Sequence, residues 1–357
     1  MRKITNIFLI LLLIGCANIV VPTGGEKDIE APRVLSVEMT ENNKQNKIVT
    51  FEFDEYIQLN KWEKNFFVSP PIKNSIQKNI RGYKLILTIE GKLAPLTHYL
   101  SLNYCIKDNN EGNILDELEY KLSTNGVVDT LTLSGNLRDA YTLRPLENTW
   151  IMLFNSDVND TVIFNSMPEY ISKTDTKGFF YFPNLKDKYY KIVAVTEDDF
   201  TYDKEEKIAF LDSVVNAKTD SFISLFAFDP LDTIHQGLID TIPLKIDSII
   251  LDSTPQKEDI PSGSLQIIFT EEHPCIFQLI QNDKVKIEAS FNKFPYLFDN
   301  IPPGNYALKY IIDSNKDSLW STGNWEKRMQ PEKTLNYPSE IMIRSNWDLE
   351  LDWTNLE

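Results

Sequence analysis

Short runs of β-branched, aromatic and aliphatic residues, each closed by a turn signal, follow one another along most of this sequence. Apolar and polar residues alternate within the runs at residues 48–53, 85–89 and 98–102. Turn-forming residues interrupt the runs, as at residues 81–82 and 108–112. Strands at intervals of about 8–12 residues are typical of antiparallel β-sandwiches. No segment shows the apolar period of a long amphipathic helix, so the sequence predicts an all-β protein.

The β-rich runs fall into three groups, which predict tandem antiparallel β-sandwiches behind a signal segment. A length of 357 residues is enough for two or three domains. Turn-rich segments separate the groups near residues 123–126 and between residues 212 and 263. The predicted parts are a signal segment at 1–15, a tether at 16–30, sandwiches at 31–126, 127–230 and 264–357, and a linker at 231–263.

The first sixteen residues carry a targeting signal. Arg2 and Lys3 precede an apolar run at residues 7–14, which is too short for a membrane-spanning helix of about 20 residues. The run therefore predicts a secretory signal peptide. Residues 13–16, Leu-Ile-Gly-Cys, resemble the lipobox of bacterial lipoproteins, in which the cysteine is acylated and becomes the first residue after cleavage. The resemblance implies that diacylglycerol and palmitate-type chains on Cys16 attach the protein to a lipid bilayer. An ordinary signal peptide with an incidental cysteine is the alternative.

The charge balance excludes some function classes. With 36 Lys and Arg against 52 Asp and Glu, the net charge of −16 argues against nucleic acid, because phosphate binding needs basic residues. Cleavage before Cys16 removes Arg2 and Lys3 and no acid, so the mature chain has a charge of −18. The three histidines are scattered, and no nucleophile or phosphate-loop motif accompanies them. The sequence therefore predicts that the protein is not an enzyme and binds no cofactor apart from its covalent lipid.

Three cysteines are too few for a disulfide framework or a metal cluster. With Cys16 assigned to the lipid, Cys105 and Cys275 remain in different predicted sandwiches. Both have apolar or aromatic neighbours, which favours buried free thiols inside strands. An interdomain disulfide is the alternative, because an exported protein enters an oxidising compartment.

The second and third predicted sandwiches share an internal repeat. Phe-Pro-Asn-Leu at residues 182–185 is followed by Tyr190 and an acidic loop. Phe-Asp-Asn-Ile at residues 298–301 is followed by Tyr306 and an acidic loop at residues 313–317. The pattern predicts one β unit used twice, with a buried tyrosine on the return strand. Chance similarity between two β segments is the alternative.

Several segments together indicate a family. Residues 22–28 follow the lipobox cysteine, and residues 53–57, Phe-Asp-Glu-Tyr-Ile, precede Val-Ser-Pro-Pro at residues 68–71. These segments resemble the N-terminal SbsA-type bacterial Ig-like domain of a Bacteroidota-type outer-membrane lipoprotein family. Residues 173–180 and 189–190 make the second unit similar to a carboxypeptidase-regulatory or prealbumin-like β-sandwich. The third unit is similar to the C-terminal end of the same family at residues 313–323, 330–332 and 344–348.

One acidic loop has the side-chain spacing of a calcium site. Asp313, Asn315 and Asp317 place oxygen ligands at alternate positions, as a hard cation requires. The glycine of a calcium loop is replaced by Ser318, and Asn324 stands where a bidentate acid is expected. A calcium site is one interpretation. An exposed acidic hairpin loop over packed tryptophans is the other.

Two further patterns concern the surface. Asp followed by Ser or Thr and then an apolar residue or Thr recurs, and it resembles an O-glycosylation site of envelope proteins in the same bacterial group. The candidate acceptors between residues 212 and 254 are Ser213, Thr233, Thr241, Ser248 and Ser253. Turn chemistry ahead of a strand is the alternative. Six tryptophans could form a sugar-binding platform, although aromatic side chains in sandwiches usually belong to the core. They are Trp62, Trp150, Trp320, Trp325, Trp347 and Trp353.

These features predict a non-catalytic, lipid-anchored outer-membrane lipoprotein. We expect it to act as a structural or protein-interaction subunit of a cell-envelope complex, because sandwiches present edges and end loops on a stiff scaffold. Its expected partners are the bilayer, through Cys16, and other envelope proteins. A glycan- or solute-binding surface module serving a transporter is the alternative, and a hydrolase without a recognisable motif is the third. The sequence leaves open whether the protein faces the periplasm or the cell surface.

Overall fold

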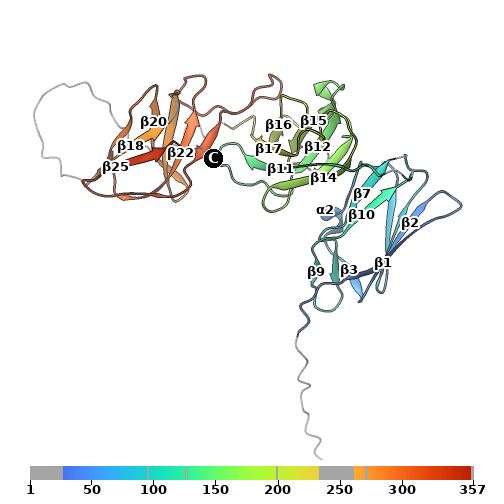
Figure 1. The fold of residues 1–357 in the computed structure, drawn as a ribbon. Coiled ribbons are helices and arrows are strands. Elements are labelled where there is room, and N and C mark those ends of the chain that lie inside the picture. Colours follow the sequence, from blue (N-terminus) through green and yellow to red (C-terminus); the bar gives the residue numbers. More distant parts are fainter. Residues whose placement is uncertain are drawn as a thin grey trace, which may run out of the picture. The chain divides into compact units, whose positions relative to one another are not determined.

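The computed structural model describes residues 27–232 and 261–354, apart from residues 95, 125, 127, 198–199 and 270–271. Strands dominate, and the described part contains one short α-helix, α2 (Trp62–Asn65), and a 3-10 segment, η1 (Asp160–Phe164). The all-β prediction is confirmed (Figure 1). Among these residues, no helix has the length and apolar character needed to cross a bilayer.

The described residues form two compact units. The first contains the residues up to Phe66 together with Asn74–Lys92 and Leu102–Leu118. The second contains Phe67–Lys73, Leu93–Ser101 and the residues from Glu119 onward. The domain boundaries proposed from the sequence remain predictions, and most of the predicted linker lies outside the described residues.

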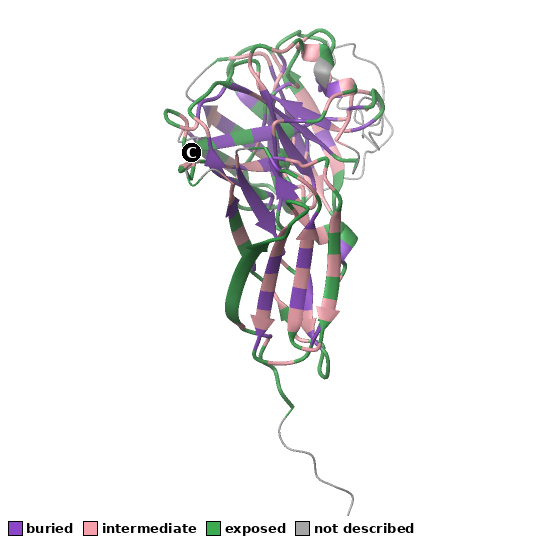
Figure 2. Ribbon diagram, turned by 90° about the vertical axis from the view of Figure 1, so that its right-hand side faces the viewer, coloured by how far each residue is buried: buried purple, intermediate pink, exposed green. Residues whose placement is uncertain are grey.

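The first unit is built on two antiparallel sheets. One sheet has the order β1 (Val34–Glu41), β2 (Lys47–Phe53), β6 (Lys84–Ile89), β5 (Ile76–Arg81). The other has the order β3 (Ile57–Leu59), β8 (Ile106–Asp108), β9 (Ile114–Leu115). Alternate residues of β2 and β6 are fully buried, which is the pattern expected where one sheet face covers a core. Figure 2 shows this alternation as stripes along the strands.

The carboxylate of the last residue of β8 stabilises the turn that follows this strand. Asp108 is buried, and its two carboxylate oxygens accept hydrogen bonds from the backbone N–H groups of Asn110, Glu111, Gly112 and Asn113 at 2.6–2.9 Å. Burial alone raises the pKa of Asp108, but the four backbone donors outweigh burial and hold it below its ordinary value. The turn predicted at residues 108–112 is thus an Asx turn, in which the Asp108 side chain bonds to the backbone of the residues that follow it.

The second unit begins with a three-stranded sheet of order β10 (Glu119–Ser123), β7 (Thr97–Ser101), β4 (Phe67–Ser69). The second sandwich follows. Its first sheet has the order β14 (Phe179–Leu185), β11 (Leu131–Asp139), β17 (Phe222–Ala227). Its second sheet has the order β13 (Tyr170–Lys173), β12 (Trp150–Asn155), β15 (Tyr190–Val195), β16 (Ile208–Phe210).

The third sandwich has the same plan. One sheet has the order β21 (Tyr296–Ile301), β18 (Gly263–Phe269), β25 (Asp348–Trp353). The other has the order β20 (Lys284–Phe291), β19 (Cys275–Gln281), β22 (Gly304–Ile312), β23 (Thr334–Asn336), and β24 (Ile341–Ile343) also pairs with β22. Each of the two sandwiches contains one parallel pair, β11 with β17 and β18 with β25. Alternation within a run cannot reveal such a pair, because it does not encode strand direction.

The internal repeat is confirmed in detail. Asn184 and Asn300 both have positive φ, 61° and 58°, at equivalent points of the repeated motif. The hydroxyl of Tyr190 donates to the Lys186 carbonyl at 3.1 Å, and that of Tyr306 donates to the Pro302 carbonyl at 2.9 Å. A tyrosine that bonds to the backbone a few residues upstream fixes the corner before its strand, as in other β-sandwiches.

A glycine marks the closest packing inside the second sandwich. A Cβ atom on Gly135 would lie 2.1 Å from the Ile223 carbonyl oxygen and 2.4 Å from the Phe180 ring. We expect Gly135→Ala to lower the free energy of unfolding by about 1–3 kcal/mol, because β11, β14 and β17 must separate to admit the methyl group. Urea denaturation followed by circular dichroism measures the change. Thr132→Ala, at an exposed position of the same strand, is the control and should change it by less than about 0.5 kcal/mol.

Candidate interaction surfaces

Most predicted modification sites lie outside the described residues. Cys16, Thr233, Thr241, Ser248 and Ser253 belong to this group. Ser213 is described and is exposed in a bend after β16. Lipidation and glycosylation therefore remain predictions, and the structure adds only that Ser213 is accessible.

The predicted calcium residues lie in one turn and bond to each other and to the backbone. Asp313 is buried, and its Oδ1 and Oδ2 accept the N–H groups of Asp317 and Ser318 at 3.2 and 3.0 Å. Asn315 Nδ2 donates to Asp317 Oδ2 and to Ser321 Oγ, both at 2.8 Å. Within the described residues, no three or more His, Cys, Asp or Glu side chains are grouped to hold a metal ion. Calcium binding at this loop remains a prediction.

Two buried glutamates, to which the sequence pattern assigns no role, organise the acidic loops of the repeat. Glu206 accepts the N–H groups of Glu197 at 2.9 Å and Asp203 at 3.1 Å. Glu332 accepts those of Ser314 at 2.7 Å and Ser321 at 3.1 Å. Burial raises the pKa of Glu332, and its backbone donors offset only part of that rise. Glu206 lies two residues before β16, and Glu332 lies two residues before β23. This shared position is the sequence signal that could have identified the two glutamates.

The loop of the third sandwich is longer than its counterpart, and it carries two tryptophans. Fifteen residues lie between Tyr190 and Glu206, whereas twenty-five lie between Tyr306 and Glu332. Trp320 and Trp325 from this loop are buried in one hydrophobic cluster with second-sandwich residues. Those residues include Tyr141, Trp150, Met152, Tyr202, Phe210 and Phe228. The loop therefore packs on the outer side of the second sandwich at β16, whereas Phe67 and Phe200 pack on Trp150 of β12.

Close contacts define this covering loop. The Trp325 ring packs edge-on against Phe210 with centroids 4.8 Å apart. The Arg328 guanidinium lies 4.3 Å from the centre of Trp325 and 4.4 Å from that of Phe210, and Nη2 donates to the Leu211 carbonyl at 3.0 Å. A Cβ atom on Gly323 would lie 2.5 Å from the Phe228 ring. Cation–π and aromatic contacts of this kind add to the free energy of simple burial.

A polar network joins the same two sandwiches beside the covering loop. The Tyr141 hydroxyl donates to Gln278 Oε1 at 2.8 Å, and Gln278 Nε2 donates to Glu288 Oε2 at 2.7 Å. Lys309 is buried, donates to the Tyr141 carbonyl, and has its Nζ 4.5 Å from the centre of the Tyr141 ring. Burial lowers the pKa of Lys309 to about 8, although nearby Asp139 opposes this. The second and third sandwiches thus share both an apolar core and buried polar contacts.

The tryptophans belong to the core with one exception. Trp62, Trp150, Trp320, Trp325 and Trp353 are buried, which confirms the core interpretation for these five. Trp347 is 57% exposed. A sugar-binding platform made of several tryptophans is therefore not formed.

The two remaining cysteines are free and buried. Burial raises the pKa of the Cys105 and Cys275 thiols to about 12, so both stay protonated and unreactive at neutral pH. The interdomain disulfide considered as an alternative is not formed. Cys275 begins β19 as expected, whereas Cys105 lies in the turn just before β8 and not inside a strand.

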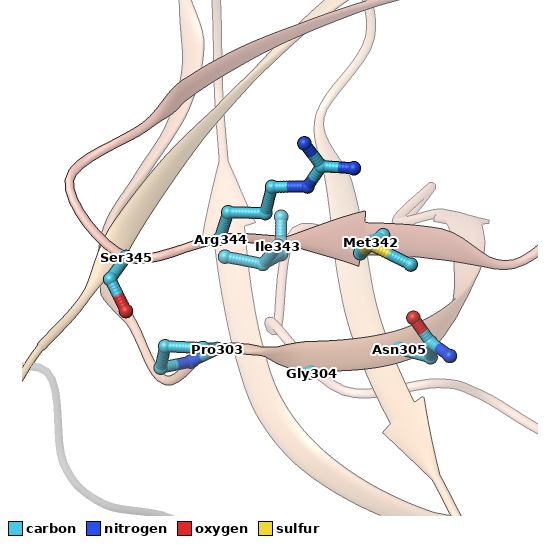
Figure 3. A pocket seen from close by; sticks show the side chains of 7 residues that line it. All are labelled: Pro303, Gly304, Asn305, Met342, Ile343, Arg344 and Ser345. Carbon is cyan, nitrogen blue, oxygen red and sulfur yellow. The ribbon is translucent and has the colours of Figure 1, made fainter.

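A surface hollow of about 490 Å³ lies where β24 pairs with the start of β22. Figure 3 shows its lining, with side chains from these two neighbouring segments. The lining residues are Pro303, Gly304, Asn305, Met342, Ile343, Arg344 and Ser345. The lining of this hollow contains one cationic side chain, Arg344, and no carboxylate or imidazole. Its residues therefore offer no acid–base pair for catalysis.

An aromatic face is exposed on the second sandwich. It consists of the outward side chains of β14, β11 and β17, and four of these are large apolar groups that are 40–55% exposed. The four are Phe179, Tyr181, Phe222 and Phe226. The strand register places Ser134 between Tyr181 and Phe222, and Asn136 between Phe179 and Ser224. The charged side chain on this face is Arg138 of β11, which lies beside Phe226 of β17.

Comparison with known families identifies the first domain. Residues 28–124 match the model of a family described as a bacterial Ig-like domain. The Ig-like nature predicted for this segment is therefore confirmed, whereas its SbsA type and the lipoprotein family remain predictions. No curated protein matches the sequence.

Matches among solved structures include three pilus proteins. The backbone protein of the group B streptococcus pilus 2b is 11% identical, with 55% of this chain and 98% of that chain covered and a TM-score of 0.19. The major pilin subunit of Bacillus cereus is 10% identical, with 55% and 71% covered and a TM-score of 0.19. A streptococcal ancillary pilin is 12% identical, with 78% and 80% covered and a TM-score of 0.17. Likeness at this level carries no inference about function.

Proposed function

We propose that this chain is a lipid-anchored outer-membrane lipoprotein that serves, without catalysis, as a structural or protein-interaction subunit of a cell-envelope complex. The observation that carries the structural role is the cluster in which Trp320 and Trp325 pack against the second sandwich. Two sandwiches that share a core resist bending relative to each other, because any hinge motion would expose buried aromatic surface. Such a block suits a spacer or a scaffold that holds partners at a fixed separation.

The proposed attachment depends on the lipobox at residues 13–16. We expect the full chain to fractionate with outer membranes and to incorporate labelled palmitate, and Cys16→Ser to lose both properties. Cys275→Ala is the matched control, because this cysteine is buried and should have no part in lipidation. Persistent membrane association and labelling of Cys16→Ser would contradict the anchor.

The proposed role in a complex has its own test. Mild cross-linking of intact cells, followed by purification of the full chain in detergent, should recover one or more envelope proteins in a fixed ratio. Protease treatment of whole cells then shows whether the chain faces outward. Recovery of the chain alone, at every detergent concentration and with cross-linker present, would refute the interaction role.

A further inference from the structure

We propose that the free edge of β17, with the aromatic face beside it, binds an extended segment of a partner protein by β-strand addition. The inference rests on the proposed function and deepens it by naming the surface that makes the contact. In this binding mode, backbone hydrogen bonds to the edge supply affinity, and alternate side chains of the added strand supply specificity.

The backbone of β17 points the right way for a further strand. Ser134 N donates to the Ser221 carbonyl at 3.3 Å, and Ala140 N donates to the Ala227 carbonyl at 2.7 Å. Successive residues of a strand direct their N–H and C=O groups to opposite sides, so the odd-numbered residues of β17 face β11. The N–H and C=O groups of the even-numbered residues therefore point to the other side. On that side β16 pairs only with Phe228, just beyond the strand, and no strand of the described residues pairs with Phe222–Phe226.

The even-numbered residues also supply the exposed side chains. Phe222 and Phe226 are 55% and 42% exposed, and Ser224 lies between them. An added strand would thus find hydrogen-bonding groups and apolar contacts at the same three residues. Exposed apolar edge strands are uncommon because they pair with other chains, so an open one is a functional feature or an aggregation hazard.

The third sandwich shows how the same edge is protected elsewhere in this chain. Its equivalent strand, β25, also pairs in parallel with only one neighbour, β18. Its outward residues are Asp348, Glu350 and Asp352, all exposed acids. Charged side chains on an edge oppose pairing. The edge strand of the third sandwich therefore carries acids, whereas the edge strand of the second sandwich carries phenylalanines and no acid.

One charged group on the aromatic face defines the chemistry of the partner. Arg138 is exposed and forms no ion pair within the described part of the chain. A segment with apolar residues at alternate positions and one carboxylate near Arg138 would complete the face. A second copy of this chain brings an identical face without a carboxylate, so it does not satisfy Arg138.

A synthetic peptide tests the edge directly. The probe is a fluorescent, proline-free peptide of alternating valine and threonine with one aspartate near an end, titrated against the full chain in detergent and followed by anisotropy. We expect saturable binding that Ser224→Pro weakens at least tenfold, because proline removes an outward N–H while the bonds to β11 stay intact. Glu350→Pro on β25 is the matched control and should leave binding unchanged. Phe222→Glu provides a second variant if the proline variant does not fold.

The arginine has a separate readout. Arg138→Ala should weaken binding of the aspartate peptide. The variant should then bind this peptide no more tightly than a peptide in which asparagine replaces the aspartate. If the variant prefers the aspartate peptide over the asparagine peptide as strongly as the original chain does, Arg138 does not bind the carboxylate of the partner.

Hydrogen exchange identifies what occupies the edge. In the free chain, the amides of Phe222, Ser224 and Phe226 should exchange fast, whereas those of Ile223 and Leu225 should be protected, and the peptide should protect all five. If all five amides are protected without peptide, another segment of this chain occupies the edge of β17. If dimers form as the concentration rises, a second copy of the chain occupies it. Either result overturns the inference, as does equal peptide binding by Ser224→Pro. If envelope partners still co-purify with Ser224→Pro, the proposed function stands and this surface assignment alone fails.

Discussion

Trp325→Ala should destabilise both C-terminal sandwiches, although the substitution lies in only one of them. Truncation of a buried tryptophan costs about 3–5 kcal/mol, because the lost contacts leave a cavity that neighbours fill only in part. Here the variant also loses the ring over which Arg328 stacks and the edge-on contact with Phe210. Hydrogen exchange of the full chain is the measurement, with the amides of β16 in the second sandwich as the reporter.

The control for this variant is Trp347→Ala. Trp347 is 57% exposed, so its truncation should change the free energy of unfolding by less than about 0.5 kcal/mol. If Trp325→Ala speeds exchange only in strands of the third sandwich, the shared cluster does not couple the two folds, and the proposed rigid block is wrong.

Lys309→Met should change how stability depends on pH. The pKa of Lys309 is lowered from 10.5 to about 8 by burial, so the folded chain binds its proton less tightly than the unfolded chain does. Below about pH 8 the lysine is charged in both states, and the cost of burying the charge is fully present. Between pH 8 and 10.5 the folded chain is already neutral at this site, so the free energy of unfolding gains up to about 3 kcal/mol as pH rises.

Urea denaturation at several pH values measures this gain as the difference between the two proteins. The groups that act on Lys309 include Asp139, which favours its charged form, and Arg144, which opposes it. The Tyr141 carbonyl accepts a hydrogen bond from Lys309 Nζ, and the Tyr141 ring lies beside the same atom. The methionine variant should lack the rise between pH 8 and 10.5, and Lys284→Met, an exposed position in β20, should retain it. A rise of equal size in Lys309→Met would show that Lys309 is not the titrating group.

Local patterns in the sequence were sufficient to predict the strands. The alternating runs at residues 48–53, 85–89 and 98–102 correspond within one residue to β2, β6 and β7. The repeat predicted the two buried tyrosines, because Tyr190 and Tyr306 follow the same Asn-containing motif, and the structure adds their hydrogen bonds to the backbone. Such features depend on nearest neighbours and on the two-residue period of a strand, which a single sequence records directly.

Features that depend on distant segments could not be predicted in the same way. The sequence places Trp320 and Trp325 beneath a hairpin loop or on a sugar platform, but their ring partners Tyr141 and Phe210 lie 179 and 115 residues earlier in the chain. The parallel pairing of β17 and the outward direction of its phenylalanines also follow from topology. Whether an aromatic residue in a strand lies inside or outside depends on the sheet that covers it, and that choice is not encoded locally.

The long loop of the third sandwich also sets an order of assembly. A chain that emerges from a ribosome or a translocation pore N-terminus first presents Phe210 and Phe228 well before Trp320 and Trp325 have followed. At about 5–20 residues per second, synthesis leaves the aromatic surface around Phe210 uncovered for roughly 5–20 s. A fragment that stops after β17 would keep that surface bare and should be aggregation-prone. The outer side of the second sandwich is therefore complete only after the third sandwich has followed it along the chain.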